Sequence, residues 1–151
     1  MKLWKWLAPF LFAGTALGCG GAGIVITGPI DLVLESLGMP TLGVRGLAIQ
    51  VRSGVHNQGV GTAGAFVVKF YLSTNTTVDA GDGVIGQRTF SSLNPPNVSE
   101  AVSSHAIPSN QPAGTYYLIA VVDANSQVDE TDETNNTRVS AGTIQVRAMT
   151  V

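Results

Sequence analysis

Apolar and polar residues alternate along several short stretches of this chain. Successive side chains of a β-strand point to opposite faces, so an apolar residue at every second position indicates a strand with one buried face. Between positions 65 and 72, Phe66 and Phe70 lie on one face and Lys69 lies on the other. The stretch 47–55 has the same period. Both stretches are therefore predicted to be half-buried strands.

Strands are predicted in seven places, at 31–35, 47–55, 65–72, 84–90, 101–107, 115–123 and 139–146. Turn signals rich in Gly, Pro and Asn separate them, such as Asn57-Gln58-Gly59 and Pro112-Ala113-Gly114. The segment 115–123 is apolar on both faces, which favours a central strand. No segment has the period of an amphipathic helix. We therefore predict an all-β fold, an immunoglobulin- or fibronectin-like antiparallel β-sandwich of about seven strands.

Composition narrows the class of protein further. The chain has 151 residues, which is enough for one domain, and 44% of them are hydrophobic while only 12% are charged. That share of apolar residues excludes a disordered chain. The formal net charge of −2 gives no basic surface for nucleic acid, so no nucleic-acid partner is expected.

The first 18 residues have the three parts of a signal peptide. Lys2 and Lys5 form a positive start, an apolar stretch follows, and Ala16-Leu17-Gly18 places small residues where a signal peptidase cleaves. We therefore predict a signal peptide at 1–18, a flexible Gly-rich tether at 19–30, a β-sandwich at 31–147 and a short C-terminal tail at 148–151.

Cys19 follows this leader and is the only cysteine, so no disulfide can form within the chain. The segment from Ala16 to Cys19 resembles the lipobox of bacterial lipoproteins, although the commonest lipobox has leucine where Ala16 stands. The resemblance implies a lipid on Cys19 and attachment to a membrane of the cell envelope. Cleavage after Gly18 without lipid, giving a secreted protein, and an uncleaved anchor at 6–30 are the alternatives. All three place the β-domain outside the cytoplasm.

Motifs spread along the predicted sandwich resemble the CARDB family, the cell-adhesion-related domain found in bacteria. They are Asn57-Gln58-Gly59, Phe70-Tyr71-Leu72-Ser73, Asp79-Ala80-Gly81-Asp82, Ile85-Gly86, Pro112-Ala113-Gly114-Thr115-Tyr116-Tyr117-Leu118, and the stretch from Val128 to Asn136. The last block is the most specific. The resemblance implies an immunoglobulin-like sandwich of the kind carried by surface proteins of bacteria and archaea.

Tyr116 follows a turn at Gly114 and opens a predicted strand, a position that resembles the tyrosine corner of sandwich folds. Its hydroxyl is therefore expected to bond to nearby backbone. Asn135 and Asn136 end the acidic stretch and are interpreted as turn residues. These four residues are assigned structural roles.

Carboxylates gather in the stretch that precedes the last strand. Five of the ten acidic residues lie within eleven positions, namely Asp123, Asp129, Glu130, Asp132 and Glu133. Oxygen ligands suit calcium, so these residues are candidate calcium ligands, and Asp79 and Asp82 form a second candidate pair. An EF-hand is excluded, because Val128 replaces the required glycine and Thr134 replaces the bidentate glutamate. A solvated loop without metal is the alternative.

No motif of an enzyme is present. His56 and His105 are the only histidines. Ser53 lies close to His56 in the sequence, but no spacing places a partner carboxylate beside them. We therefore name no catalytic residue. The sequence predicts a non-enzymatic adhesion or interaction module with a protein or polysaccharide ligand, held to the membrane by its N-terminal lipid. The alternative is a structural or accessory subunit of a larger envelope assembly; an envelope hydrolase remains a third class to be tested.

Overall fold

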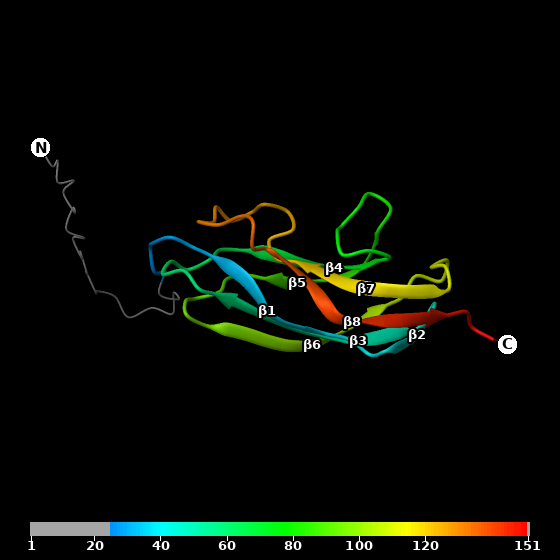
Figure 1. Cartoon of the computed structure of the whole chain (residues 1–151). Coiled ribbons are helices and arrows are strands. Elements are labelled where there is room, and N and C mark those ends of the chain that lie inside the picture. The colour runs from blue at the N-terminus through cyan, green and yellow to red at the C-terminus, as the bar shows by residue number, and fades with distance from the viewer. Residues whose placement is uncertain (1–24, 151) are drawn as a thin grey trace, which may run out of the picture.

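The computed structural model describes residues 25–150, which fold into eight strands with no helix (Figure 1). The leader at 1–18, Cys19 and the first part of the tether lie outside the described residues. Within 25–150, nothing has the length and apolar character of a membrane-crossing helix. The strands are β1 (Leu32–Gly38), β2 (Leu42–Val44), β3 (Ala48–Asn57), β4 (Phe66–Ser73), β5 (Gly83–Phe90), β6 (Val98–Ala106), β7 (Gly114–Val121) and β8 (Thr137–Arg147).

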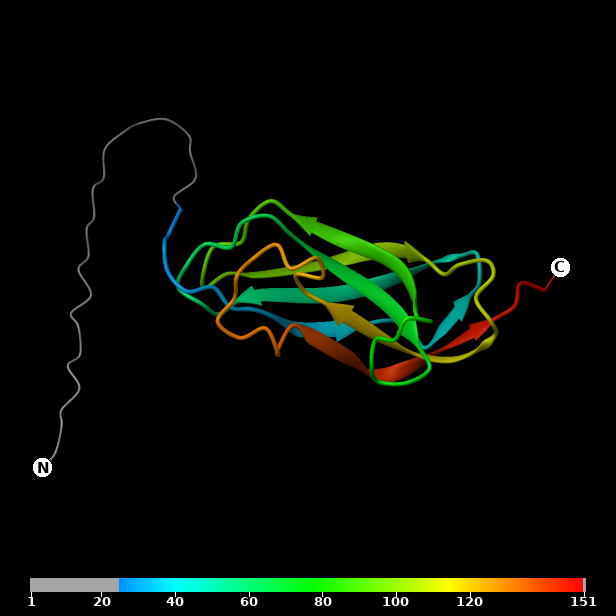
Figure 2. The ribbon, with the colours of Figure 1, turned by 90° about the horizontal axis from the view of Figure 1, so that it is seen from above.

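The strands form two sheets that pack face to face (Figure 2). One sheet has the order β1-β3-β6 and the other has the order β2-β8-β7-β4-β5. Every neighbouring pair is antiparallel except β2 and β8, which run parallel. The predicted all-β sandwich is confirmed. The doubly apolar segment is β7, which lies between β8 and β4 as a central strand.

The core forms from the alternating side chains of the long strands. Phe66, Val68, Phe70 and Leu72 on β4 are all at most 1% exposed. Phe66 stacks on Phe90 of β5 with 4.5 Å between ring centroids. Each such buried side chain contributes about 1.5–3 kcal/mol to folding, so β4 anchors the sandwich.

The structure differs from the predicted strands in three details. The three-residue strand β2 was not predicted, because it is too short for an alternation to be visible. Leu47 is 49% exposed rather than part of the buried face, because it lies in the turn before β3 that follows Gly46. Strand β6 begins at Val98 and directs Val98 and Val102 to solvent.

Two arginines form hydrogen bonds between the two sheets, one from β8 and one from β5. Arg138 on β8 donates a 3.0 Å hydrogen bond to the carbonyl of Leu34 on β1. On the other side, Arg88 on β5 donates to the carbonyl and hydroxyl of Ser53 at 3.0 and 2.9 Å and to the hydroxyl of Ser99 at 3.1 Å. Arg138 therefore links β1, and Arg88 links β3 and β6, to the five-stranded sheet.

Candidate functional site: the acidic loop between β7 and β8

The acidic loop, defined here as residues 123–136, connects β7 to β8 and begins with a turn closed by Asp123. Asp123 is 4% exposed, and its two carboxylate oxygens accept the backbone N–H groups of Gln127 and Val128 at 2.9 and 2.8 Å. Asp123 and Ser126 have φ values of 45° and 50°, which a turn of this kind requires. Both oxygens of Asp123 are thus used by the loop's own backbone.

The next part of the acidic loop forms hydrogen bonds with the residues that lead into β1. The Leu32 N–H donates to Oε2 of Glu130 at 2.6 Å. The Thr131 N–H and hydroxyl both donate to the Ile30 carbonyl, at 2.9 and 3.0 Å. These contacts join segments about 100 positions apart in sequence, at the end of the sandwich where the described chain begins (Figure 1).

Asp31 adds a second attachment at the same place. Its two carboxylate oxygens accept Nδ2 of Asn135 and Nε2 of Gln58, each at 2.8 Å. The acidic loop, the turn after β3 and the start of β1 therefore form one hydrogen-bonded unit.

Glu130 and Glu133 converge on the amide of Asn136. Nδ2 of Asn136 lies 3.0 Å from Oε1 of Glu130 and 3.4 Å from Oε2 of Glu133. The other oxygen of Glu133 accepts the Glu130 N–H at 3.0 Å. Burial raises the pKa of Glu130 to about 7, against the hydrogen bonds from Leu32 and Asn136 and with the help of the charges of Glu133 and Asp123. Glu130 is thus a carboxylate whose negative charge is poorly stabilised.

Two amide oxygens at the end of this loop are buried without a hydrogen-bond partner. They are Oδ1 of Asn135 and Oδ1 of Asn136, and the Asn136 residue is only 8% exposed. Buried polar atoms are nearly always bonded, so each of these oxygens calls for an explanation. The sequence predicted turn roles for both asparagines. It did not indicate that Asn135 contacts the Asp31 carboxylate or that Asn136 contacts the Glu130 carboxylate.

The other candidate metal ligands lie outside this convergence. Asp132 accepts the Thr134 hydroxyl and N–H, which lower its pKa, and Asp129 is exposed. Asp79 and Asp82 bond to each other's backbone in the separate loop between β4 and β5 (Figure 1). Within 25–150, no three His, Cys, Asp or Glu side chains come together as a metal-binding group. Calcium binding stays a prediction.

The Tyr116 hydroxyl donates a 2.9 Å hydrogen bond to the carbonyl of Pro112, four residues earlier. Tyr116 is 6% exposed. Gly114 lies beside it, where a Cβ would make an ordinary contact 3.6 Å from the ring. Tyr116 therefore closes the turn into β7, and Gly114 is not sterically required by the ring.

Both histidines contact a polar side chain. His105 is 7% exposed, its Nε2 lies 2.7 Å from the Ser103 hydroxyl, and its ring packs on Phe70. A Cβ at Gly86 would overlap with the Nδ1 atom of His105, so the ring fills the space over that glycine. Burial lowers the pKa of His105. Nδ1 of His56 pairs with Glu35 at 2.7 Å. Among residues 25–150, no carboxylate bonds to the second ring nitrogen of His105.

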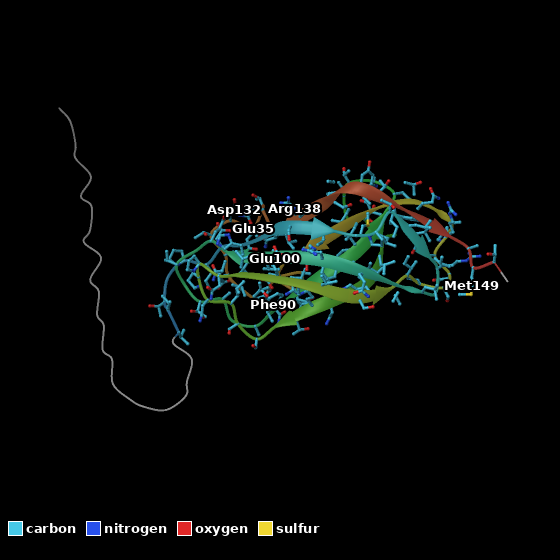
Figure 3. All side chains as sticks on the ribbon, turned by 90° about the horizontal axis from the view of Figure 1, so that it is seen from below. Glu35, Phe90, Glu100, Asp132, Arg138 and Met149 are labelled. Carbon is cyan, nitrogen blue, oxygen red and sulfur yellow. The ribbon has the colours of Figure 1, made fainter. Side chains whose placement is uncertain are left out.

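A shallow hollow lies on the outer face of the three-stranded sheet, where β1 ends. It measures about 330 Å³ and is lined by Gly38, Met39, Gln50, Arg52 and Val102. None of these lining residues belongs to the acidic loop, whose Asp132 is labelled in the view from below in Figure 3. The hollow and the acidic loop are therefore separate surface features.

Comparisons with known proteins identify a family and solved structures that this chain resembles. The model of the CARDB family matches residues 29–140. The CARDB domain of a Pyrococcus furiosus protein, described in complex with di-metal ions, is 20% identical, with a TM-score of 0.57 over 80% of this chain and 96% of that chain. A domain of a Methanosarcina acetivorans protein, provisionally described as a cell surface protein, is 24% identical, with a TM-score of 0.56 over 79% of this chain and 93% of that chain.

The same sandwich recurs within a larger protein. A β-glucosidase from Listeria innocua is 14% identical, with a TM-score of 0.50 over 82% of this chain but only 17% of that chain. At these identities the likeness shows the fold. A search of curated protein sequences gave no match. The family match covers most of the residues from the first strand to the last, and the chain therefore belongs to the CARDB family.

Proposed function

We propose that this protein is an exported, non-enzymatic adhesion or interaction module that a lipid on Cys19 holds at the cell envelope. The observation that carries the proposal is the CARDB domain itself, whose match spans 29–140 and directly follows a sequence with the features of a lipoprotein leader. The likeness to a domain of a protein described as belonging to the cell surface agrees with this location.

The arrangement of the sandwich supports a binding role for its outer face. A chain anchored through its N-terminus would enter at the end where the acidic loop holds Ile30 and Leu32. The hollow at the end of β1 would then lie on the side of the domain, some distance along β3 from the anchored end. Gln50 and Arg52 supply hydrogen-bonding groups there, beside the apolar Met39 and Val102. Such a mixture suits a protein or polysaccharide surface.

Binding by variants of the hollow tests the proposal. The full chain in detergent would be applied to arrays of envelope polysaccharides and to isolated envelope proteins. Arg52→Glu and Val102→Asp should each weaken binding at least tenfold. Arg147→Glu and Val78→Asp make the same chemical changes at exposed positions outside the hollow and should leave binding unchanged.

Two results would favour the other classes of function. Stable co-purification with one envelope subunit, without binding to any ligand alone, would indicate an accessory role. Turnover of an envelope substrate that is lost in His105→Ala would indicate a hydrolase built on the Ser103–His105 pair. Either result would overturn the proposal.

A further inference from the structure

Apolar side chains gather at the end of the sandwich where the described chain begins. Val25 is 74% exposed, Ile26 is 43% exposed, and Val60, in the turn after β3, is 58% exposed. Hydrogen bonds join the two segments. The Ile26 N–H donates to the Thr62 hydroxyl at 3.0 Å, and the Thr62 N–H donates to the Ile26 carbonyl at 2.7 Å. Residues from both segments therefore form one surface.

Two further contacts fix the shape of this surface. The Pro29 carbonyl accepts the N–H groups of Val60 and Gly61, each at 2.9 Å, and Pro29 itself is exposed. The Val60 side chain lies over Gly28, where an added Cβ would come within 2.7 Å of Cγ2 of Val60. We call this surface the apolar tip and define it as Val25, Ile26, Pro29 and Val60.

The connections around the apolar tip carry no charge. Three segments at this end contain no Asp, Glu, Lys or Arg, namely 25–30, the turn 58–65 and the connection 91–97 between β5 and β6. The last of them belongs to the same end because Oδ1 of Asn94 accepts the Thr62 hydroxyl at 3.0 Å. An exposed apolar surface of this kind marks a place where a protein meets another protein or a membrane.

The length of the chain before the apolar tip favours a membrane as the occupant. Cys19 precedes Val25 by six positions, which span at most about 20 Å when fully extended. A lipid on Cys19, the part of the proposed function on which this inference rests, would keep the apolar tip within that distance of the bilayer. A short flexible tether gives an effective concentration in the millimolar range, so even a weak contact with lipid would form.

We propose that the apolar tip inserts into the lipid–water interface of the membrane that carries the Cys19 lipid, and so holds the domain on its end. Interfacial segments bury their apolar side chains just below the headgroups. Strand β3 runs away from this end for ten residues, about 33 Å, towards the end where β2 lies (Figure 1). The hollow lined by Arg52 and Val102 would therefore stay clear of the bilayer.

The acidic loop determines which lipids the apolar tip prefers. It lies at the same end, since Thr131 bonds to Ile30, and it exposes Asp129, Asp132 and Glu133. Their negative charges repel anionic headgroups, and salt screens this repulsion. The apolar tip should therefore insert readily into zwitterionic lipid and less readily into anionic lipid at low ionic strength.

Tryptophan fluorescence in vesicles tests the proposal. Trp4 and Trp6 are the only tryptophans, so Trp4→Phe together with Trp6→Phe removes this fluorophore from the chain. In that background, Val60→Trp places a single tryptophan on the apolar tip. Leu47→Trp is the matched control, because Leu47 is 49% exposed at the opposite end of β3. The full lipid-bearing chain would be reconstituted in phosphatidylcholine vesicles with brominated acyl chains, which quench tryptophan inside the bilayer.

Brominated lipid should lower the fluorescence of Val60→Trp at least twofold and should leave that of Leu47→Trp nearly unchanged. Ile26→Asp places a charge on the apolar tip and should abolish the quenching of Val60→Trp. Val84→Asp introduces a charge on β5, where Val84 is 48% exposed, and should leave this quenching intact. Replacing about half of the lipid with phosphatidylglycerol should reduce the quenching at low salt and restore it at high salt.

The mass of the chain separates this inference from the lipid on which it rests. If Cys19 carries no lipid, the proposed anchoring fails. A maleimide-bearing lipid coupled to Cys19, the only thiol, then replaces the natural anchor, and the same measurement decides on the apolar tip. Absence of quenching in Val60→Trp, equal quenching in Leu47→Trp, or quenching that survives Ile26→Asp would each overturn the proposal. Dimers that Ile26→Asp disperses would show that the apolar tip binds a second copy, and would also overturn it.

Discussion

Arg138 on β8 and Leu34 on β1 join the two sheets through a 3.0 Å hydrogen bond from the guanidinium to the Leu34 carbonyl. The register of β1 against β3 shifts between Leu34 and Ser36. The bond therefore supports β1 next to its irregularity, close to the acidic loop that holds the beginning of the same strand.

Replacement of Arg138 should loosen this side of the sandwich. Arg138→Met keeps most of the side chain and removes the donor. We expect the free energy of unfolding to fall by about 1 kcal/mol, less than the ~1.5–3 kcal/mol of a charged hydrogen bond, because the arginine is exposed. Urea unfolding measures the change. Arg147→Met, at an exposed position on the same strand, is the control and should cost less than ~0.5 kcal/mol. Equal losses in the two variants would show that the Leu34 bond contributes nothing of its own.

Tyr116→Phe removes the hydroxyl that bonds to Pro112 and leaves the buried ring in place. We expect it to lower the free energy of unfolding by roughly 0.5–1.5 kcal/mol, the net value of one hydrogen bond. Tyr117 is half-buried and faces the other side of β7, so Tyr117→Phe should cost less. An unfolding curve of Tyr116→Phe that coincides with that of the wild type would contradict the stabilising role of the Tyr116 hydroxyl.

His105 should make the free energy of unfolding fall at mildly acidic pH. Burial lowers its pKa in the folded state, so below the ordinary value of 6.5 the unfolded chain binds more protons than the folded chain. The contribution of neutral His105 is therefore present above that pH and is lost as the pH falls. Its ring faces Ser103, Phe70 and Gly86, and within the described part of the chain it has no hydrogen bond to a charged group.

The variant His105→Gln cannot titrate and isolates this effect. Between pH 7 and pH 5 its stability should fall less than that of the wild type. Glu130, whose pKa is raised to about 7, acts in the opposite direction, because its folded state favours the proton, but it contributes equally to both proteins. Stability profiles of the same slope in the two proteins would contradict the prediction.

Cys19 should carry lipid in cells that produce the full chain. Metabolic labelling with a fatty acid should label the wild type and not Cys19→Ala, because Cys19 is the only cysteine and follows Ala16-Leu17-Gly18. More than one acyl chain is needed for firm attachment, since a single chain binds a membrane only marginally. Equal labelling of the two proteins, or a mature mass that still includes residues 1–18, would contradict lipidation.

Alternation along the chain predicted the seven longer strands, because a strand with one buried face repeats every two residues. The three residues of β2 are too few to show that period, and their parallel pairing with β8 depends on where the rest of the chain lies. The hydrogen bond of Tyr116 spans four residues, and the preceding turn is visible in the sequence, so its geometry could be predicted locally.

The sequence shows that the loop is acidic, but it does not show which groups its carboxylates contact. Asp123 turns its oxygens to the loop backbone because of a left-handed turn that no residue type enforces. Glu130 and Leu32 meet across 98 positions, and no local pattern reports such a contact. The burial of Asn136 between two carboxylates is a product of the same long-range packing.

Photo-crosslinking in intact cells tests the central claim, an envelope module that binds through its outer face. A photoreactive residue at Val102, which lines the hollow and is 56% exposed, should capture one envelope polysaccharide or protein when the chain carries Cys19. The same residue at Val78, 39% exposed in the loop between β4 and β5, should capture little. Capture of the same molecule at both positions, or of none at Val102, would contradict the account.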